Sequence, residues 1–333
     1  MIQELEIQKQ FFEEVRKKLS PSLSLADVVS DELNISADSA YRRIRGESGL
    51  SLDEAKKLCL KFDISLDSLV GKTSDFVVFD YRAIALESFG FDQHISSILD
   101  NLRLLKQFDE KKVIYSALDL PFFYYYIYPN LAAFKHFFWM RNLLNYSGFQ
   151  EKCFDPKIVP QEILDRGKNI WEGYLTIPSI EIWSDETINT TLRQINFYHE
   201  SGMFKDPAQT QAVLEDVRMV ISHLQKQADC GCKFLPGKEP SGDSENFKLY
   251  YNEVILSDNT IFLKMGDLNT VHVVHNVLNI LTTSDPVFCK DTMFIIERLL
   301  KNSTMISVSS EKERNRFFNI LFNKIDVLEQ KIL

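Results

Sequence analysis

Three arginines gather in the segment 36–45, SADSAYRRIR, and are the clearest chemical feature of the sequence: Arg42, Arg43 and Arg45. Only Ala40 and Ile44 in this segment require burial, and they are four residues apart on one face of a helix. Tyr41 and the arginines are left for the exposed side. Guanidinium groups bind phosphates well. The segment therefore predicts a short helix that presents positive charge to nucleic acid.

A second short helix must position the first one. The apolar residues of segment 24–33 recur at helical spacing, at Leu25, Val28, Val29 and Leu33. Asn34 then interrupts the period, and an asparagine tolerates the backbone of a tight turn. Ile35 can fill the angle between the two helices, and Ser36 can cap the second. Together these features predict a helix-turn-helix.

Flanking residues extend the pair into a small domain. An amphipathic helix with Phe12, Val15 and Leu19 precedes it, and Ser51 with Glu54 forms a capping box that opens another helix. A last short helix is expected over residues 64–69.

Over residues 5–71 the chain resembles the phage-repressor-like (xenobiotic-response-element type) helix-turn-helix domains of bacterial transcriptional regulators. The resemblance rests on four segments: Leu25-Ala26, Leu33-Asn34-Ile35-Ser36, Ile44-Arg45-Gly46-Glu47 and Ile64-Ser65-Leu66-Asp67-Ser68-Leu69. The family commonly has glycine where Asn34 stands. The resemblance implies a five-helix domain, a double-stranded DNA partner and a homodimer on a two-fold site.

It further implies that the helix from Ser36 to Arg45 enters the major groove. The residues expected nearest the base edges are Ala37, Asp38, Ser39 and Arg42. The residues expected to contact phosphates are Tyr41, Arg43 and Arg45, and Ser36 would cap the helix and offer its backbone N–H to a phosphate.

Overall charge excludes a polycation that coats nucleic acid. The 333-residue chain has a net charge of −9, and residues 1–72 carry 11 Lys and Arg against 13 Asp and Glu. DNA binding by this domain would therefore depend on where its arginines lie. Non-specific binding should be modest and sensitive to salt.

Composition is that of an ordinary globular protein, 45% hydrophobic and 26% charged. The five cysteines are scattered and odd in number, which favours reduced thiols in the cytoplasm. Residues 1–10 do not resemble a signal peptide. The aromatic stretch 118–140 is interrupted by Pro121, Pro129 and Lys135, so we expect no membrane span.

Three other groups of residues have a chemical interpretation beside a structural one. Asp119 follows an expected strand, a common place for ligand-binding groups, although a helix or turn cap is the favoured interpretation. The aromatic block 122–139 suits a core, and alternatively an apolar effector pocket or a dimer interface. The segment 309–314 suits a capped helix start, and alternatively an anion site with Arg314.

Candidate metal ligands are weak. His272 and His275 would lie on opposite faces of a strand, and Cys230 and Cys232 have one intervening residue where zinc sites usually have two or more. We therefore expect no metal and no cofactor.

Beyond the first domain we expect a mixed α+β fold with a larger, mostly helical α/β body. A strand over 76–79, a helix over 94–108 and a strand over 112–117 suggest a parallel βαβ unit. Strands over 247–256, 260–265 and 270–275 suggest a small C-terminal antiparallel meander. Further helices are expected over 130–146, 208–228, 286–301 and 310–328, and a short strand over 304–308. The expected domains are residues 1–72, 73–235 and 236–333, the last two packed as one effector or dimerisation unit.

The function predicted from these features is that of a bacterial, cytoplasmic, homodimeric transcription regulator. It would bind double-stranded DNA and respond to a small-molecule or protein effector, if any, and it would not be an enzyme. Two alternatives remain. The body is a nuclease or hydrolase-like enzyme brought to DNA by the first domain, or the first domain binds a protein.

Overall fold

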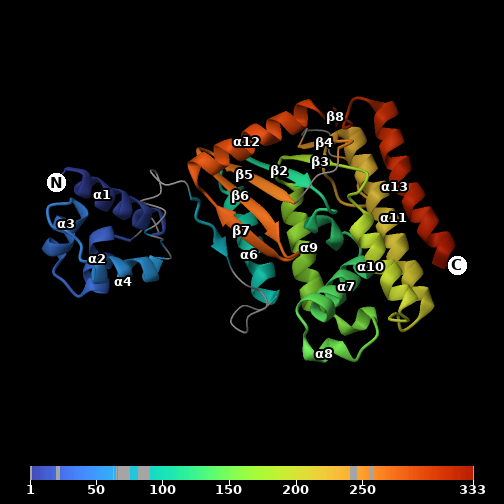
Figure 1. The fold of residues 1–333 in the computed structure, drawn as a ribbon, viewed down its shortest axis with the longest axis horizontal. Coiled ribbons are helices and arrows are strands. Elements are labelled where there is room, and N and C mark those ends of the chain that lie inside the picture. Colours follow the sequence, from blue (N-terminus) through green and yellow to red (C-terminus); the bar gives the residue numbers. More distant parts are fainter. Residues whose placement is uncertain are drawn as a thin grey trace. The chain divides into compact units, whose positions relative to one another are not determined.

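The computed structural model of the chain describes residues 2–19, 23–62, 64, 66, 76–81, 91–240, 246–254 and 259–332. These form two compact units, residues 1–78 and 79–333 (Figure 1). The fold is mixed α+β, as the sequence predicts. We call the units the head and the body.

The described helices of the head are α1 (Ile2–Lys17), α2 (Leu25–Leu33), α3 (Ala37–Ile44) and α4 (Leu52–Phe62). They enclose a small core made of Phe11, Phe12, Val15, Leu25, Val29, Leu33, Ala40 and Leu58. Of the short helix expected over 64–69, all residues except 64 and 66 lie outside the described residues.

Local sequence accounts for the bend between α2 and α3. Asn34 adopts the left-handed conformation, with φ 52° and ψ 48°, which asparagine tolerates better than most residues. The Ser36 hydroxyl then accepts a hydrogen bond from the Ser39 backbone N–H at 3.2 Å and caps α3. An asparagine at this position is therefore compatible with the tight turn between the two helices.

The body is built on one eight-stranded mixed sheet. Its order is β1-β7-β6-β5-β2-β3-β4-β8. Strands β2, β3 and β4 are parallel to one another, and the remaining pairings are antiparallel. The strands are β1 (Asp80–Tyr81), β2 (Lys111–Ala117), β3 (Ser179–Trp183), β4 (Phe247–Tyr251), β5 (Thr260–Met265), β6 (Leu268–His275), β7 (Asn279–Thr283) and β8 (Thr304–Met305).

Helices cover both faces of this sheet. On one face α12 (Pro286–Lys301) packs Cys289 and Ile296 against Ile114, Ile182 and Phe262 of three strands (Figure 1). The larger core lies on the opposite face. The remaining helices are α6 (Phe91–Lys106), η2 (Phe122–Tyr126), α7 (Pro129–Phe138), η3 (Trp139–Leu143), α8 (Ser147–Gln150), η4 (Pro156–Ile158), α9 (Gln161–Leu175), α10 (Asn189–Glu200), α11 (Pro207–Cys230) and α13 (Glu311–Ile332). Within the described residues, no helix has both the length and the apolar character needed to span a bilayer.

The expected βαβ unit is wrong. Residues 76–79 form no strand, and β1 occupies the next two residues, Asp80 and Tyr81. It pairs antiparallel with β7, and three strands (β7, β6 and β5) separate it from β2 in the sheet. The parallel neighbour of β2 is β3, a strand inside a region expected to be mostly helical.

The expected meander is displaced by one strand. The first of its three expected strands, β4, pairs parallel with β3 instead of with β5. The antiparallel meander consists of β5, β6 and β7, and the sequence analysis did not predict the last of these. From the short spacing along the chain we expected β4 to pair with β5. In the sheet, β5 and β4 lie on opposite sides of β2.

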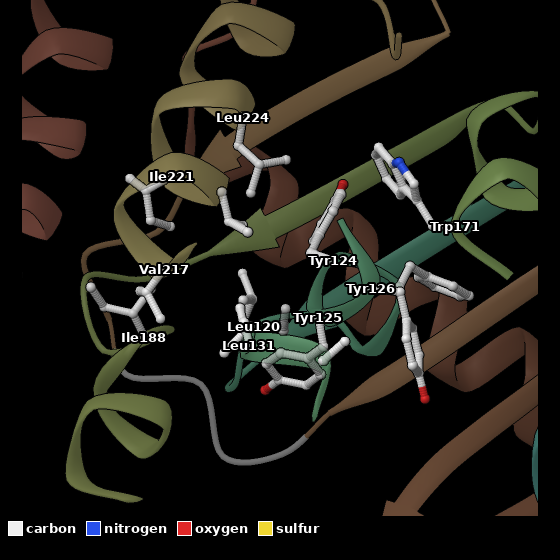
Figure 2. Packing of buried hydrophobic residues seen from close by; sticks show 14 of the residues in the cluster. Leu120, Tyr124, Tyr125, Tyr126, Leu131, Trp171, Ile188, Val217, Ile221 and Leu224 are labelled. Carbon is white, nitrogen blue, oxygen red and sulfur yellow. The ribbon is translucent and has the colours of Figure 1, made fainter. Parts of the chain in front are cut away.

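The aromatic block forms part of the core. Its segment η2 is a 3₁₀-helix, in which successive side chains are about 120° apart. Figure 2 shows Tyr124, Tyr125 and Tyr126 pointing in three different directions from it. One short segment therefore supplies large rings to three parts of the core.

Replacing Gly167 of α9 tests how tightly this layer packs. A Cβ at Gly167 would overlap the ring of Tyr126, whereas a Cβ at Gly148 would meet no atom within 4 Å. We expect Gly167→Ala to lower the free energy of unfolding by about 1–3 kcal/mol. Gly148→Ala, the matched control, should be neutral or slightly stabilising. Urea unfolding of both variants measures the difference, and equal stabilities would contradict the packing.

Candidate functional site

Most of the predicted DNA-contacting residues lie at the surface of α3. Ser36, Ala37, Asp38, Tyr41, Arg42 and Arg45 are exposed, and Ser39 is half-buried. Ala40 is fully buried against the other helices, as its small side chain suggested. The exposed positions begin at the capped N-terminus of the helix and continue to its end.

Arg43 differs from the other two arginines. Its Nη2 and Nε bond to the Glu54 carboxylate at 2.8 and 3.4 Å, and its Nη1 bonds to the Ser39 carbonyl oxygen at 3.3 Å. Only 19% of its side chain is exposed. Arg43 therefore joins α3 to α4 inside the head, a structural role that the sequence analysis did not foresee.

Glu54 links this ion pair to the start of α4. Its carboxylate accepts the Ser51 backbone N–H at 2.9 Å, and its own N–H donates to the Ser51 hydroxyl at 3.2 Å, so the predicted capping box is confirmed. Burial alone would raise the pKa of Glu54, but the hydrogen bonds from Ser51 and Arg43 outweigh burial and lower it. The carboxylate thus stays charged and fixes Arg43.

Arg42 and Arg45 remain accessible. Within the described part of the chain, the exposed side chain of Arg42 makes no hydrogen bond or ion pair, and only its backbone carbonyl oxygen accepts hydrogen bonds, from the Glu47 and Ser48 N–H groups. Arg45 lies 3.6 Å from Glu47, is 66% exposed, and stands 5.8 Å from the centre of the Tyr41 ring. These two guanidinium groups and the Tyr41 hydroxyl form the accessible hydrogen-bonding surface of the helix.

A double-mutant cycle tests the distinction between the Arg43–Glu54 and Arg45–Glu47 ion pairs of the head. Replacing Arg43 and Glu54 by glutamine, singly and together, should give a coupling energy of about 1 kcal/mol, because the contact has two points and is largely shielded. The same cycle on Arg45 and Glu47 should give nearly zero, as exposed pairs do. Thermal unfolding of the wild type and the six variants measures both, and equal couplings would contradict the assigned role of Arg43.

The second candidate site is a cavity in the body at the carboxyl end of β2. Asp119 lines it, together with Phe122, Tyr125 and Trp139 of the aromatic block. The cap interpretation of Asp119 is wrong. The residue that precedes η2 is Pro121, and within the described part of the chain no cap hydrogen bond comes from Asp119. The aromatic block is part of the core, as expected, and some of its rings line this cavity. Its alternative roles, an effector pocket or a dimer interface, stay predictions.

The sequence analysis missed the burial of several charged side chains of the body, among them Lys135, Glu181 and Lys233. Lys135 lines the cavity, and its Nζ donates to the Gln194 amide oxygen at 2.7 Å. Burial lowers its pKa to about 7, against the opposing effect of Asp119. Only the burial of Glu181 could have been predicted from the sequence. In a strand its side chain alternates with those of Ile180 and Ile182 and therefore lies on the same face as Trp183, a residue that is usually buried.

The two candidate histidine ligands are separated. His272 lines the cavity, whereas His275 is exposed and its ring centre lies 6.1 Å from that of Tyr81. A second histidine, His94 of α6, also lines the cavity. Burial lowers the pKa of both His94 and His272 to about 4, so both are neutral at pH 7.

The depressed pKa of His272 predicts a loss of stability in acid. The unfolded chain binds a proton near pH 6.5 and the folded chain only near pH 4, so stability is lost as the pH falls through this window. The free energy of unfolding of the wild type should fall between pH 7 and pH 5, and we expect His272→Gln to make this fall smaller by roughly 2 kcal/mol. Urea unfolding at both values measures it.

The matched control is His275→Gln, which replaces the same side chain at an exposed position of the same strand. If that variant loses as much of the pH dependence as His272→Gln does, the burial of His272 is not the cause.

The remaining candidates have structural roles. Arg314 is 4% exposed and donates to the carbonyl oxygens of Ile306 and Ser309, so it does not face an external anion. The Cys230 and Cys232 sulfur atoms lie 3.0 Å apart as free thiols. Among the described residues no three His, Cys, Asp or Glu side chains converge as metal ligands do.

Comparisons of the chain with protein-family models, curated proteins and solved structures find no match.

Proposed function

We propose that the chain is a sequence-specific transcription regulator that binds double-stranded DNA through α3 of its head. It acts by binding and not by catalysis, in a bacterial cytoplasm. The observation that carries the proposal is the exposed face of α3, where Arg42 and Arg45 are free of strong internal partners while Arg43 is held by Glu54.

The architecture of the head favours a groove-binding role for this helix. The left-handed Asn34 and the Ser36 cap set the angle between α2 and α3, so α2 braces a helix whose exposed end is polar. Ala37, Asp38, Ser39 and Arg42 lie toward base edges in this proposal. Tyr41, Arg45 and the capped N-terminus at Ser36 contact phosphates.

A single head supplies few contacts for specific binding, so the proposal includes a homodimer on a two-fold site, with the body supplying the contact between copies. The body also provides room for an effector. The net charge of −9 confines attraction for DNA to the arginine face, which implies a strong dependence on salt.

Replacing the two accessible arginines tests the proposal. Full-length chain carrying Arg42→Ala and Arg45→Ala should lose most of its retention of genomic DNA fragments. The slope of log affinity against log salt should fall by about 0.9 per head, because Arg45 is the one of the two that is assigned to a phosphate and each lost phosphate contact contributes about 0.9. Pull-down at two salt concentrations, followed by titration of a retained fragment, measures both effects.

The matched control is Lys56→Ala with Lys57→Ala, which removes the same charge from exposed positions of α4. This variant should retain DNA nearly as well as the wild type does. Equal losses in the two double variants, or full retention by the arginine variant, would contradict the proposal.

A further inference from the structure

The cavity beside Asp119 has the size of a single aromatic ring. Its volume is about 130 Å³, and an apolar cavity of roughly 150 Å³ is known to accommodate benzene. It lies on the face of the sheet opposite α12, between β5, β6 and β7, the helix α6 and the segment η2. All of its lining residues belong to the body.

The walls of the cavity are mainly aromatic and aliphatic. Phe122, Tyr125 and Trp139 form one side, and Ile261 and Ile280 of the sheet form another. The Phe122 and Trp139 rings stack with centres 5.5 Å apart and an interplanar angle of 16°. Such walls favour a flat apolar molecule over a strongly hydrated one.

Among the residues that the structure describes, two polar atoms of this lining find no hydrogen-bond partner. The Asp119 Oδ1 is buried and accepts no hydrogen bond, although the Asp119 backbone N–H donates to Asn259 Oδ1 at 3.1 Å. The Trp139 Nε1 is also buried and donates to no acceptor. Leaving a buried donor or acceptor unpaired is costly, so the two atoms indicate an occupant that supplies hydrogen bonds.

The cavity is lined by one acidic and one basic side chain, Asp119 and Lys135. Asp119 is acidic, and Lys135 is held nearby by Gln194 Oε1 at 2.7 Å and by the face of the Tyr125 ring at 4.2 Å. Within the described part of the chain no hydrogen bond or ion pair joins the two, yet the carboxylate acts electrostatically on the amine. A cationic occupant would be repelled by Lys135, and an anionic occupant would be repelled by Asp119. A neutral occupant avoids both repulsions.

We propose that this cavity binds a small neutral aromatic molecule of about one ring, whose hydroxyl group donates a hydrogen bond to Asp119. A hydroxyl both donates and accepts, which suits a lining with one unpaired acceptor and one unpaired donor. This proposal does not rest on DNA binding, because the lining contains no residue of the head.

Phenol and toluene are the probes that test it, since they have the same number of heavy atoms and differ only in the hydroxyl. Saturation-transfer NMR titrations against the full chain give both affinities. Phenol should bind roughly tenfold more tightly than toluene, because a hydrogen bond to a charged acceptor outweighs the extra cost of desolvating the hydroxyl.

Replacing Asp119 should remove this preference. Asp119→Leu should bind toluene at least as well as phenol, and Asp119→Asn, which keeps the size of the side chain, should show a reduced preference because a neutral acceptor is weaker. The matched control is Asp291→Leu, which removes an exposed carboxylate from α12 on the other face of the sheet and should behave as the wild type does.

Filling the cavity provides a second test. Val274→Phe, on the cavity side of β6, should abolish binding of both probes while leaving the near-ultraviolet circular dichroism of the body unchanged. Three outcomes would overturn the proposal: no binding of either probe to the wild type, equal affinities of phenol and toluene, or an unchanged preference after Asp119→Leu.

Discussion

A buried carboxylate constrains the whole body. Glu181 of β3 is fully buried, and its oxygens accept hydrogen bonds from the Tyr124 hydroxyl at 2.5 Å, the Tyr174 hydroxyl at 2.7 Å and the Trp183 Nε1 at 2.9 Å. Burial raises the pKa of Glu181 in spite of these donors, and it lowers the pKa of the neighbouring Lys233 to about 7. A charged or polar group at this depth is tolerated only where its partners surround it. The sheet, η2 and α9 are therefore held in one arrangement.

The cavity follows from that arrangement. Because Tyr124 is fixed to Glu181, the 3₁₀ geometry of η2 directs Tyr125 and Tyr126 elsewhere, as Figure 2 shows. Tyr126 fills the space that Gly167 leaves open on α9, and Tyr125 turns toward Lys135. The rings thus form a dense layer against the sheet and leave an opening where β2 ends. Dense packing and a ligand-sized space are two results of the same constraint.

Polar bonds supplement the small core of the head. Gln8 of α1 donates to the Arg43 and Ser48 carbonyl oxygens at 2.6 and 2.8 Å, and its own oxygen accepts the Leu50 N–H at 2.9 Å. Together with the ion pair between Arg43 and Glu54, these bonds fix the C-terminal end of α3, a helix of eight residues whose N-terminal end is capped by Ser36. One arginine is used to hold the helix, and the other two are left on its surface.

The sequence by itself determined the local structure of the head and most helices of the body. Asn34, Ser36 and the Ser51–Glu54 capping box act on neighbouring backbone, so their effect can be predicted from short segments. The strand pairing of the body depended on the tertiary structure, because β4 has the same local pattern whether it pairs with β3 or with β5. Likewise Asp119, Lys135 and His272 are distant in sequence and meet only after the sheet has formed. The burial of Arg43 and Lys135 was decided in the same way, since an isolated charged side chain gives no local sign of the partner that will cover it.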